Sequence, residues 1–153
     1  MKNIALVVFA ASLFGCSSQK KLEVNDIPFT LGKSTVQEWL GGKKESGSGA
    51  NLKIEISDTL KEVSFQKVYF RARALDCTTE TEGNETYVLS SYKTGAKSEE
   101  TLRTEGKKMQ KAFDIKPTEA VLEYTSDDGK THYVKVSGIK EMAPEALRSM
   151  PKN

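Results

Sequence analysis

The glycine-rich segment that follows Trp39 is the first place where residue types and spacing suggest chemistry. Trp39-Leu40-Gly41-Gly42 is followed by Gly47-Ser48-Gly49, and glycine-rich loops can bind phosphate through backbone N–H groups. A P-loop also needs Lys followed by Ser or Thr directly after its second glycine, and Ser48 stands there instead. We therefore interpret the segment as a flexible turn between strands with Trp39 packed in the core. A ligand loop that uses Trp39 is the alternative.

The single histidine of the chain, His132, limits the catalytic sites that the sequence could form. Serine hydrolysis needs a base beside its nucleophile, and no Gly-x-Ser-x-Gly sequence accompanies His132. A zinc site takes four N or S ligands, or three and a water, which Cys77 and His132 alone do not supply. The carboxylate pairs Asp127-Asp128 and Glu99-Glu100 fall in turns that we expect to be solvated. We expect no catalytic residue, no metal and no cofactor.

A second candidate binding surface comes from Tyr69, Arg71 and Arg73, which alternate within residues 63–75 and would share one face of a strand. An aromatic ring and two guanidinium groups can stack on a sugar or bind an acidic partner. A solvated sheet face is the other interpretation. Together with Trp39, these residues form our predicted binding face.

Cys16 stands at the end of a segment that is typical of secreted proteins. Lys2 precedes an uncharged apolar run, residues 4–14, which is shorter than the roughly 20 residues needed to span a bilayer. The run ends at Leu13-Phe14-Gly15-Cys16, which resembles the lipobox of bacterial lipoproteins, in which the cysteine is acylated. We expect residues 1–15 to be removed as a signal peptide and Cys16 to carry the lipid.

Several acyl chains on one cysteine hold a protein stably on a bilayer, so the expected membrane contact is through lipid. Residue 17 is Ser and not the Asp that retains lipoproteins at the inner membrane of enteric bacteria, and no acidic run follows Cys16 as an export signal to the cell surface. We expect a cell-envelope protein anchored at the periplasmic face of the outer membrane.

The mature chain has the size of one domain. Removing residues 1–15 from 153 leaves 138 residues. Lys2 is the only charged residue removed, so the mature chain contains 22 Lys and Arg and 21 Asp and Glu. This balance indicates no nucleic-acid partner. With Cys16 acylated, Cys77 has no partner for an intramolecular disulfide. We expect a tether over residues 16–26, a β-rich domain over 27–143 and a C-terminal tail over 144–153.

Apolar residues alternate with polar ones along most of the chain, which predicts short β-strands. The clearest are residues 51–56, 63–75 with a bulge near 66–67, and 86–93. A hairpin pairs 120–125 with 131–139. A two-residue turn at Asp128-Gly129 would mix polar and apolar residues on each face, whereas a three-residue loop over 127–129 sets Leu122 opposite Val134 and Tyr124 opposite His132, so we favour the loop.

Residues 93–111 are mostly polar, and Gly106 argues against a long helix. We expect a mobile connection there with one or two helical turns, and a helical turn over 144–148. About six short strands in one domain predict an all-β fold, an antiparallel β-sandwich of immunoglobulin-like general shape with at most short helical turns. An open sheet with a small helix, or a small barrel, is the alternative.

Several short motifs resemble those of a family of small, uncharacterised envelope lipoproteins of flavobacterial type. They are Trp39-Leu-Gly-Gly, Gly47-Ser-Gly49, Val68-Tyr-Phe-Arg71, Phe113-Asp-Ile-Lys116 and Glu119-Ala-Val-Leu-Glu-Tyr124. The resemblance covers roughly residues 37–140. Its motifs are structural, so it implies no activity and no catalytic or binding residue.

The sequence favours a non-enzymatic, lipid-anchored binding or assembly module of the envelope. Its expected partners are the membrane, through the lipid, and an envelope protein or a glycan. The alternative is a lipoprotein that binds a small ligand or a glycan through Trp39 or through Tyr69, Arg71 and Arg73.

Overall fold

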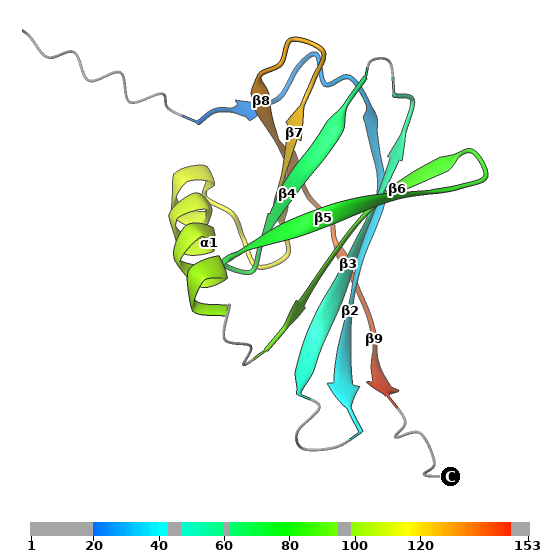
Figure 1. Cartoon of the computed structure of the whole chain (residues 1–153), viewed down its shortest axis with the longest axis vertical. Helices are drawn as coiled ribbons and strands as arrows, with labels where there is room; N and C mark the ends of the chain where they lie inside the picture. Colours follow the sequence, from blue (N-terminus) through cyan, green and yellow to red (C-terminus); the bar gives the residue numbers. More distant parts are fainter. Residues whose placement is uncertain (1–19, 43–46, 60–61, 95–98, 148–153) are drawn as a thin grey trace, which may run out of the picture.

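The computed structural model describes residues 20–42, 47–59, 62–94 and 99–147, which form nine strands and one helix (Figure 1). The elements in chain order are β1 (Leu22–Glu23), β2 (Thr30–Gly41), β3 (Ser48–Ser57), β4 (Ser64–Phe70), β5 (Arg73–Glu82), β6 (Glu85–Lys93), α1 (Glu99–Phe113), β7 (Ala120–Thr125), β8 (Thr131–Val136) and β9 (Lys140–Leu147).

The strands form a single curled sheet in the order β1-β8-β7-β4-β5-β6-β3-β2-β9. Strand β5 joins its two halves, because its first residues pair with β4 and the residues from Cys77 onward pair with β6. The right-handed twist of a strand this long carries the sheet round into a half-barrel. The all-β prediction is confirmed. The antiparallel sandwich is wrong, because the sheet is continuous and mixed, with parallel pairs β1–β8 and β2–β9.

The main core lies inside the curl and follows from strand alternation. Leu52, Ile54 and Ile56 of β3 are buried, while the residues between them point to the outer face. From the other half, Val68 and Leu122 pack into the same cluster. Each such side chain contributes about 1.5–3 kcal/mol when it is fully buried. The outer face of the β6–β3–β2 half is therefore left to polar side chains.

Helix α1 covers the outer face of the β4–β7–β8 half, where Met109 and Phe113 pack with Tyr69 and Tyr133. The prediction of a mobile connection is wrong for residues 99–113. Gly106 explains the difference: a Cβ on this residue would lie 2.3 Å from the backbone nitrogen of Arg73. Glycine is thus what lets the helix approach the β4–β5 turn.

The predicted strand over residues 63–75 is instead a hairpin. Arg71 and Ala72 both have positive φ angles, 46° and 56°, and form a two-residue turn closed by Phe70 and Arg73. The expected bulge is present, because the register of β4 with β7 shifts between Phe65 and Lys67.

The C-terminal hairpin has the predicted register. Leu122 lies opposite Val134 and Tyr124 opposite His132. Gly129 has a φ of 70°, as the three-residue loop requires.

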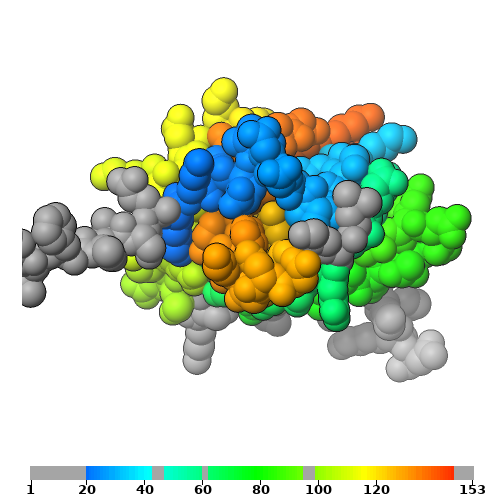
Figure 2. All heavy atoms as spheres, turned by 90° about the horizontal axis from the view of Figure 1, so that it is seen from above, coloured from blue at the N-terminus to red at the C-terminus, as the bar shows by residue number. Residues whose placement is uncertain are grey.

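Both ends of the domain differ from the prediction. Leu22 and Glu23, expected within the tether, pair with Tyr133 and Val134 of β8. Residues 144–147, expected as tail and helical turn, continue β9 beside β2 because this edge of the sheet is open to a further strand. Figure 2 looks onto the end of the molecule where the segment from Lys20 (blue), the β7–β8 hairpin (orange) and the C-terminal part of α1 (yellow) lie. Within the described ranges, no helix is long and apolar enough to cross a bilayer.

Candidate functional site

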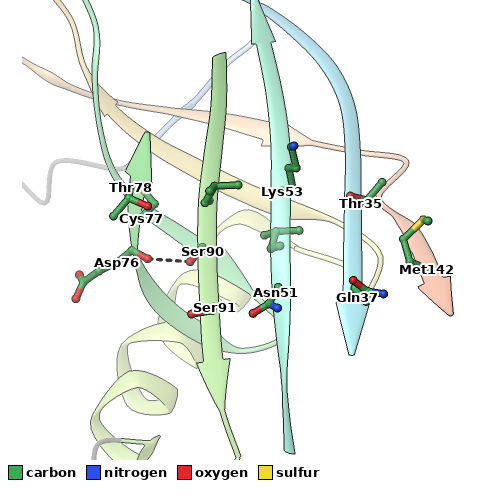
Figure 3. Close-up of a pocket in the computed structure, with 12 residues that line it drawn as sticks. Thr35, Gln37, Asn51, Lys53, Asp76, Cys77, Thr78, Ser90, Ser91 and Met142 are labelled. Atoms are coloured by element: carbon green, nitrogen blue, oxygen red, sulfur yellow. Dashed lines mark hydrogen bonds between the residues drawn. The ribbon is translucent and has the colours of Figure 1, made fainter. Parts of the chain in front are cut away.

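A groove of about 590 Å³ crosses the outer face of the half formed by β5, β6, β3, β2 and β9 (Figure 3). Most side chains that line it alternate with core residues on the same strands: Asn51 and Lys53, for example, flank the buried Leu52. The same alternation that builds the core therefore also builds the groove.

Strand register arranges these side chains in two rows that run across the strands. In each row, every residue is paired with the next one on the neighbouring strand. The first row is Met142, Gln37, Asn51 and Ser91. The second row is Thr35, Lys53, Leu89 and Thr78. Because neighbouring strands lie about 4.8 Å apart, each row extends over about 14 Å. That length can hold a ligand with several hydrogen-bonding groups.

Half of the twelve lining residues carry neutral amides or hydroxyls: Thr35, Gln37, Asn51, Thr78, Ser90 and Ser91. Within the described part of the chain, the side chains of Asn51, Ser91 and Thr78 have no hydrogen-bonding partner, so their donors and acceptors face solvent. The Nε2 group of Gln37 donates to the carbonyl of Ala143 at 3.2 Å, which fixes the amide and leaves its oxygen to accept. These groups can form hydrogen bonds to a polar ligand.

Lys53 is the cation of the groove, and its ammonium group is held toward one end. It lies 3.6 Å from the ring centroid of Tyr87 and 3.6 Å from a carboxylate oxygen of Glu82. The cation–π contact and the ion pair orient the side chain. Lys53 therefore adds one positive charge to a surface that also carries the exposed carboxylate of Asp76.

Two of the potential nucleophiles that line the groove, Cys77 and Ser90, are poorly suited to attack. They are paired across β5 and β6, and the Ser90 hydroxyl donates to the backbone carbonyl of Asp76 at 2.8 Å. Burial raises the pKa of the Cys77 thiol to about 11, so the thiol stays protonated near neutral pH. Neither of these two groups is therefore prepared for nucleophilic attack.

Trp39 lies in β2 and not in a turn, and it packs outside the core. It is paired with Gly49 of β3, and a Cβ on Gly49 would lie 2.5 Å from its ring. The indole is half-buried and stands two residues beyond Gln37 on the same face of β2. Trp39 therefore extends the groove face at the end of the strand. Residues 43–46 of the glycine-rich segment lie outside the described residues.

The predicted shared face of Tyr69, Arg71 and Arg73 is wrong, because the turn at residues 71–72 separates them. Tyr69 lies beneath α1, and its hydroxyl donates to Glu123 at 2.6 Å and lies 3.3 Å from Glu105. Burial and these carboxylates raise the pKa of Tyr69 far above its usual value.

Both arginines are engaged within the domain. Arg73 is buried, stacks 4.1 Å from the ring centroid of Tyr92 and donates to Glu99 at 2.7 Å. Arg71 reaches across to the other half of the sheet, where it binds Glu38 at 2.7 Å and also Glu141. Their contacts are those of structural residues.

His132 lies on β8, in the other half of the sheet from the groove. It stacks on Tyr124 and contacts Asp128 at 3.0 Å and Glu23 at 3.3 Å. The hydrogen bond with Asp128, followed by that with Glu23, raises the pKa of His132. Among the described residues, no three His, Cys, Asp or Glu side chains are placed to hold a metal ion.

Comparison with known proteins gave no matching family model and no curated protein of similar sequence. The resemblance to flavobacterial-type lipoproteins therefore stays a prediction. Cys16 and the signal segment lie outside the described residues, so their roles also stay predictions.

Sequence reasoning did not single out the groove residues, Asn51 and Ser91 among them. The available signal was the run of polar residues that alternates with core positions on each strand. That pattern marks an outer face, but it does not say which strands lie side by side. The groove depends on the order β6-β3-β2-β9, which contains a parallel crossover.

Proposed function

We propose that this protein is a lipid-anchored binding protein of the bacterial cell envelope, held at the periplasmic face of the outer membrane. The apolar run over residues 4–14 and the Leu13-Phe14-Gly15-Cys16 sequence support the anchor. Strand β1 begins at Leu22, six residues after Cys16, so little chain separates the proposed lipid from the sheet.

The groove is the observation that carries the binding function. It brings amide and hydroxyl groups from neighbouring strands onto one continuous surface, and several of them lack internal partners. A rigid sheet holds these groups at fixed spacings, which lowers the entropy cost of binding. The Cys77 thiol is protonated near neutral pH, and the Ser90 hydroxyl already donates to the carbonyl of Asp76. Both observations support binding rather than catalysis.

The anchor is tested by replacing Cys16 with Ala and following the protein between membrane and soluble fractions. Intact-mass analysis of the mature N-terminus gives the second readout. We expect the wild-type protein in the membrane fraction with an acylated Cys16, and the variant in the soluble fraction with a similar thermal unfolding curve. An unmodified Cys16 in the wild-type protein would overturn the anchor.

A glycan is the ligand class that the groove favours, and this is the second candidate function. Sugars present many hydroxyl groups, and amide and hydroxyl side chains such as Gln37, Asn51 and Ser91 can pair with them as donors and acceptors. Trp39 stands on the same face and offers an apolar ring edge beside these groups. An envelope protein that presents an extended polar segment is the other partner of suitable chemistry.

The groove is tested by screening the domain against envelope oligosaccharides and against crosslinked envelope proteins. The test variant is Gln37→Ala with Asn51→Ala, and the matched control is Gln66→Ala with Thr101→Ala, two exposed polar residues away from the groove. We expect the test variant to bind at least about tenfold more weakly, since each lost hydrogen bond contributes roughly 1 kcal/mol. Equal binding by both variants would exclude the groove as the site.

A further inference from the structure

The path of the chain before β1 leads it between α1 and β8. The Lys20 ammonium group lies 3.4 Å from the sulfur of Met109 on α1 and 5.3 Å from the ring centroid of Tyr133 on β8. Leu22 and Glu23 then pair with β8. The start of the domain is thus held at one place on its surface and does not swing freely.

Covalent geometry limits how far Cys16 can be from this place. Four residues of extended chain span at most about 14 Å, so the Cα atom of Cys16 stays within that distance of the Cα atom of Lys20. If Cys16 carries acyl chains, the headgroup layer of the bilayer must lie close to the surface around Lys20. This step rests on the lipid anchor of the proposed function.

That surface is rich in lysine, with Lys20 and Lys21 on the incoming chain and Lys107, Lys108 and Lys111 on the second half of α1. We call these five the tether-side lysines. The three on the helix are exposed, and Lys111 follows Lys108 by three residues and Lys107 by four, so it neighbours both on the helix surface. Among the described residues, none of the five has a carboxylate partner, in contrast to Lys67 and Lys135, which are paired with Glu105 and Glu119.

A groove of about 400 Å³ adjoins the same surface, and Lys20, Lys21 and Lys130 line it. Two carboxylates at this end, Glu23 and Asp128, are engaged by His132. Asp127 and Asp128 belong to the tip of the β7–β8 hairpin, whereas the tether-side lysines lie toward α1. Asp26 after β1 and Asp114 after α1 are two further exposed carboxylates, so the five tether-side lysines leave a net positive charge next to the tether.

From these observations we infer that the tether-side lysines form a membrane-docking surface that binds the anionic headgroups of phospholipids in the bilayer that holds the lipid anchor. Lysines near an anionic bilayer surface attract it through additive electrostatic terms, which act within about a Debye length. The surface orients the domain: α1 and β1 face the bilayer, and the half that carries the groove, at the other end of the strand order, remains accessible to a partner.

The first test is lysine footprinting of the full-length lipidated protein in vesicles. Acetylation of each lysine by an amine reagent is followed by mass spectrometry, in vesicles of phosphatidylcholine alone and with one quarter phosphatidylglycerol. We expect the tether-side lysines to react about threefold more slowly in the anionic vesicles, and Lys33, Lys93 and Lys140 to react equally in both. Equal reactivity of the tether-side lysines in the two vesicles would overturn the docking surface.

The second test separates the surface from the anchor by using the mature chain, residues 16–153, with Cys16→Ala, so that neither acyl chains nor the apolar run over residues 4–14 can hold it in the bilayer. Its binding to the anionic vesicles is compared after Lys107→Gln, Lys108→Gln and Lys111→Gln, and after the matched control Lys33→Gln, Lys93→Gln and Lys140→Gln. We expect the test variant to bind about tenfold more weakly and the control nearly as well as the parent. Equal binding by both sets overturns the surface.

The two proposals can fail separately. An unmodified Cys16 in the mature protein removes the anchor, while vesicle binding by the Cys16→Ala chain still reports on the lysines. A lipidated protein whose tether-side lysines show no protection keeps the anchor and excludes the surface. Thermal unfolding curves for both triple variants check that the fold is retained.

Discussion

The hydroxyl of Tyr69 shows how a residue that suggests ligand binding can instead form hydrogen bonds within the domain. It lies beneath α1, where Glu123 and Glu105 surround it, and the ring is almost fully buried. Sequence alternation placed Tyr69 on a strand, and it lies in β4. Only the position of the helix decides that its hydroxyl faces two carboxylates of the same chain.

Tyr69→Phe is expected to lower the free energy of unfolding by about 1–2 kcal/mol, because it leaves partly buried carboxylates without their donor. Tyr87→Phe is the matched control, since it also removes a hydroxyl that donates to a glutamate, Glu85, but at an exposed site. That change should cost clearly less than Tyr69→Phe, because water can replace the lost partner. Urea unfolding measures both, and equal costs would contradict a structural role for the Tyr69 hydroxyl.

At the scale of elements, local signals were enough to predict some strands and not others. The β7–β8 hairpin depends on a nearby loop, so its register could be predicted from Gly129 and the alternation around it. Helix α1 was missed because its buried stripe, which runs through Leu102, Gly106, Met109 and Phe113, contains a glycine. The glycine is required by contact with the distant β4–β5 turn, which local propensity does not include.

Replacing Gly106 with Ala distinguishes this contact from helix propensity. Propensity alone predicts that Ala stabilises the helix by about 1 kcal/mol. The contact with the backbone of Arg73 predicts the opposite, a loss of about 2 kcal/mol, because the helix must move away from the turn. Thr104→Ala, on the exposed side of α1, is the control and should change stability by less than about 0.5 kcal/mol. Stabilisation by Gly106→Ala in chemical denaturation would contradict the packing.

The attachment of β1 to β8 is expected to depend on pH through His132. Asp128 and then Glu23 raise the pKa of its imidazole, so the folded state binds the proton more tightly than the unfolded state. This stability is present below the unfolded pKa and is lost as pH rises through the folded pKa. Unfolding free energy should therefore fall as pH rises above the ordinary histidine pKa of about 6.5, and the fall should be smaller in His132→Gln. An identical fall in both proteins would exclude His132 as its source.

At the scale of the whole molecule, the curled sheet needs its two halves held together beyond the shared strand β5. The inner core does most of this through apolar contact between the halves. Arg71 adds a polar connection at the open side, from the β4–β5 turn to Glu38 of β2 and Glu141 of β9. The arginine lies in a left-handed turn position that costs about 1–2 kcal/mol for a residue with a Cβ. Its long side chain reaches from the turn to both glutamates in the other half.

Arg71→Gln tests whether this connection holds β9, the edge strand that borders the groove. Because Glu38 and Glu141 are more than half exposed, we expect a modest loss of stability, about 1 kcal/mol or less. Backbone hydrogen exchange should increase in β9 more than in β3, since β9 pairs with only one neighbour. Arg103→Gln is the control, because Arg103 pairs with Glu99 within α1 and does not connect the two halves. The role of Arg71 would be contradicted if exchange in β9 rises equally in both variants or in neither. A rise in Arg71→Gln alone would show that a turn in one half of the sheet controls the edge of the groove in the other half.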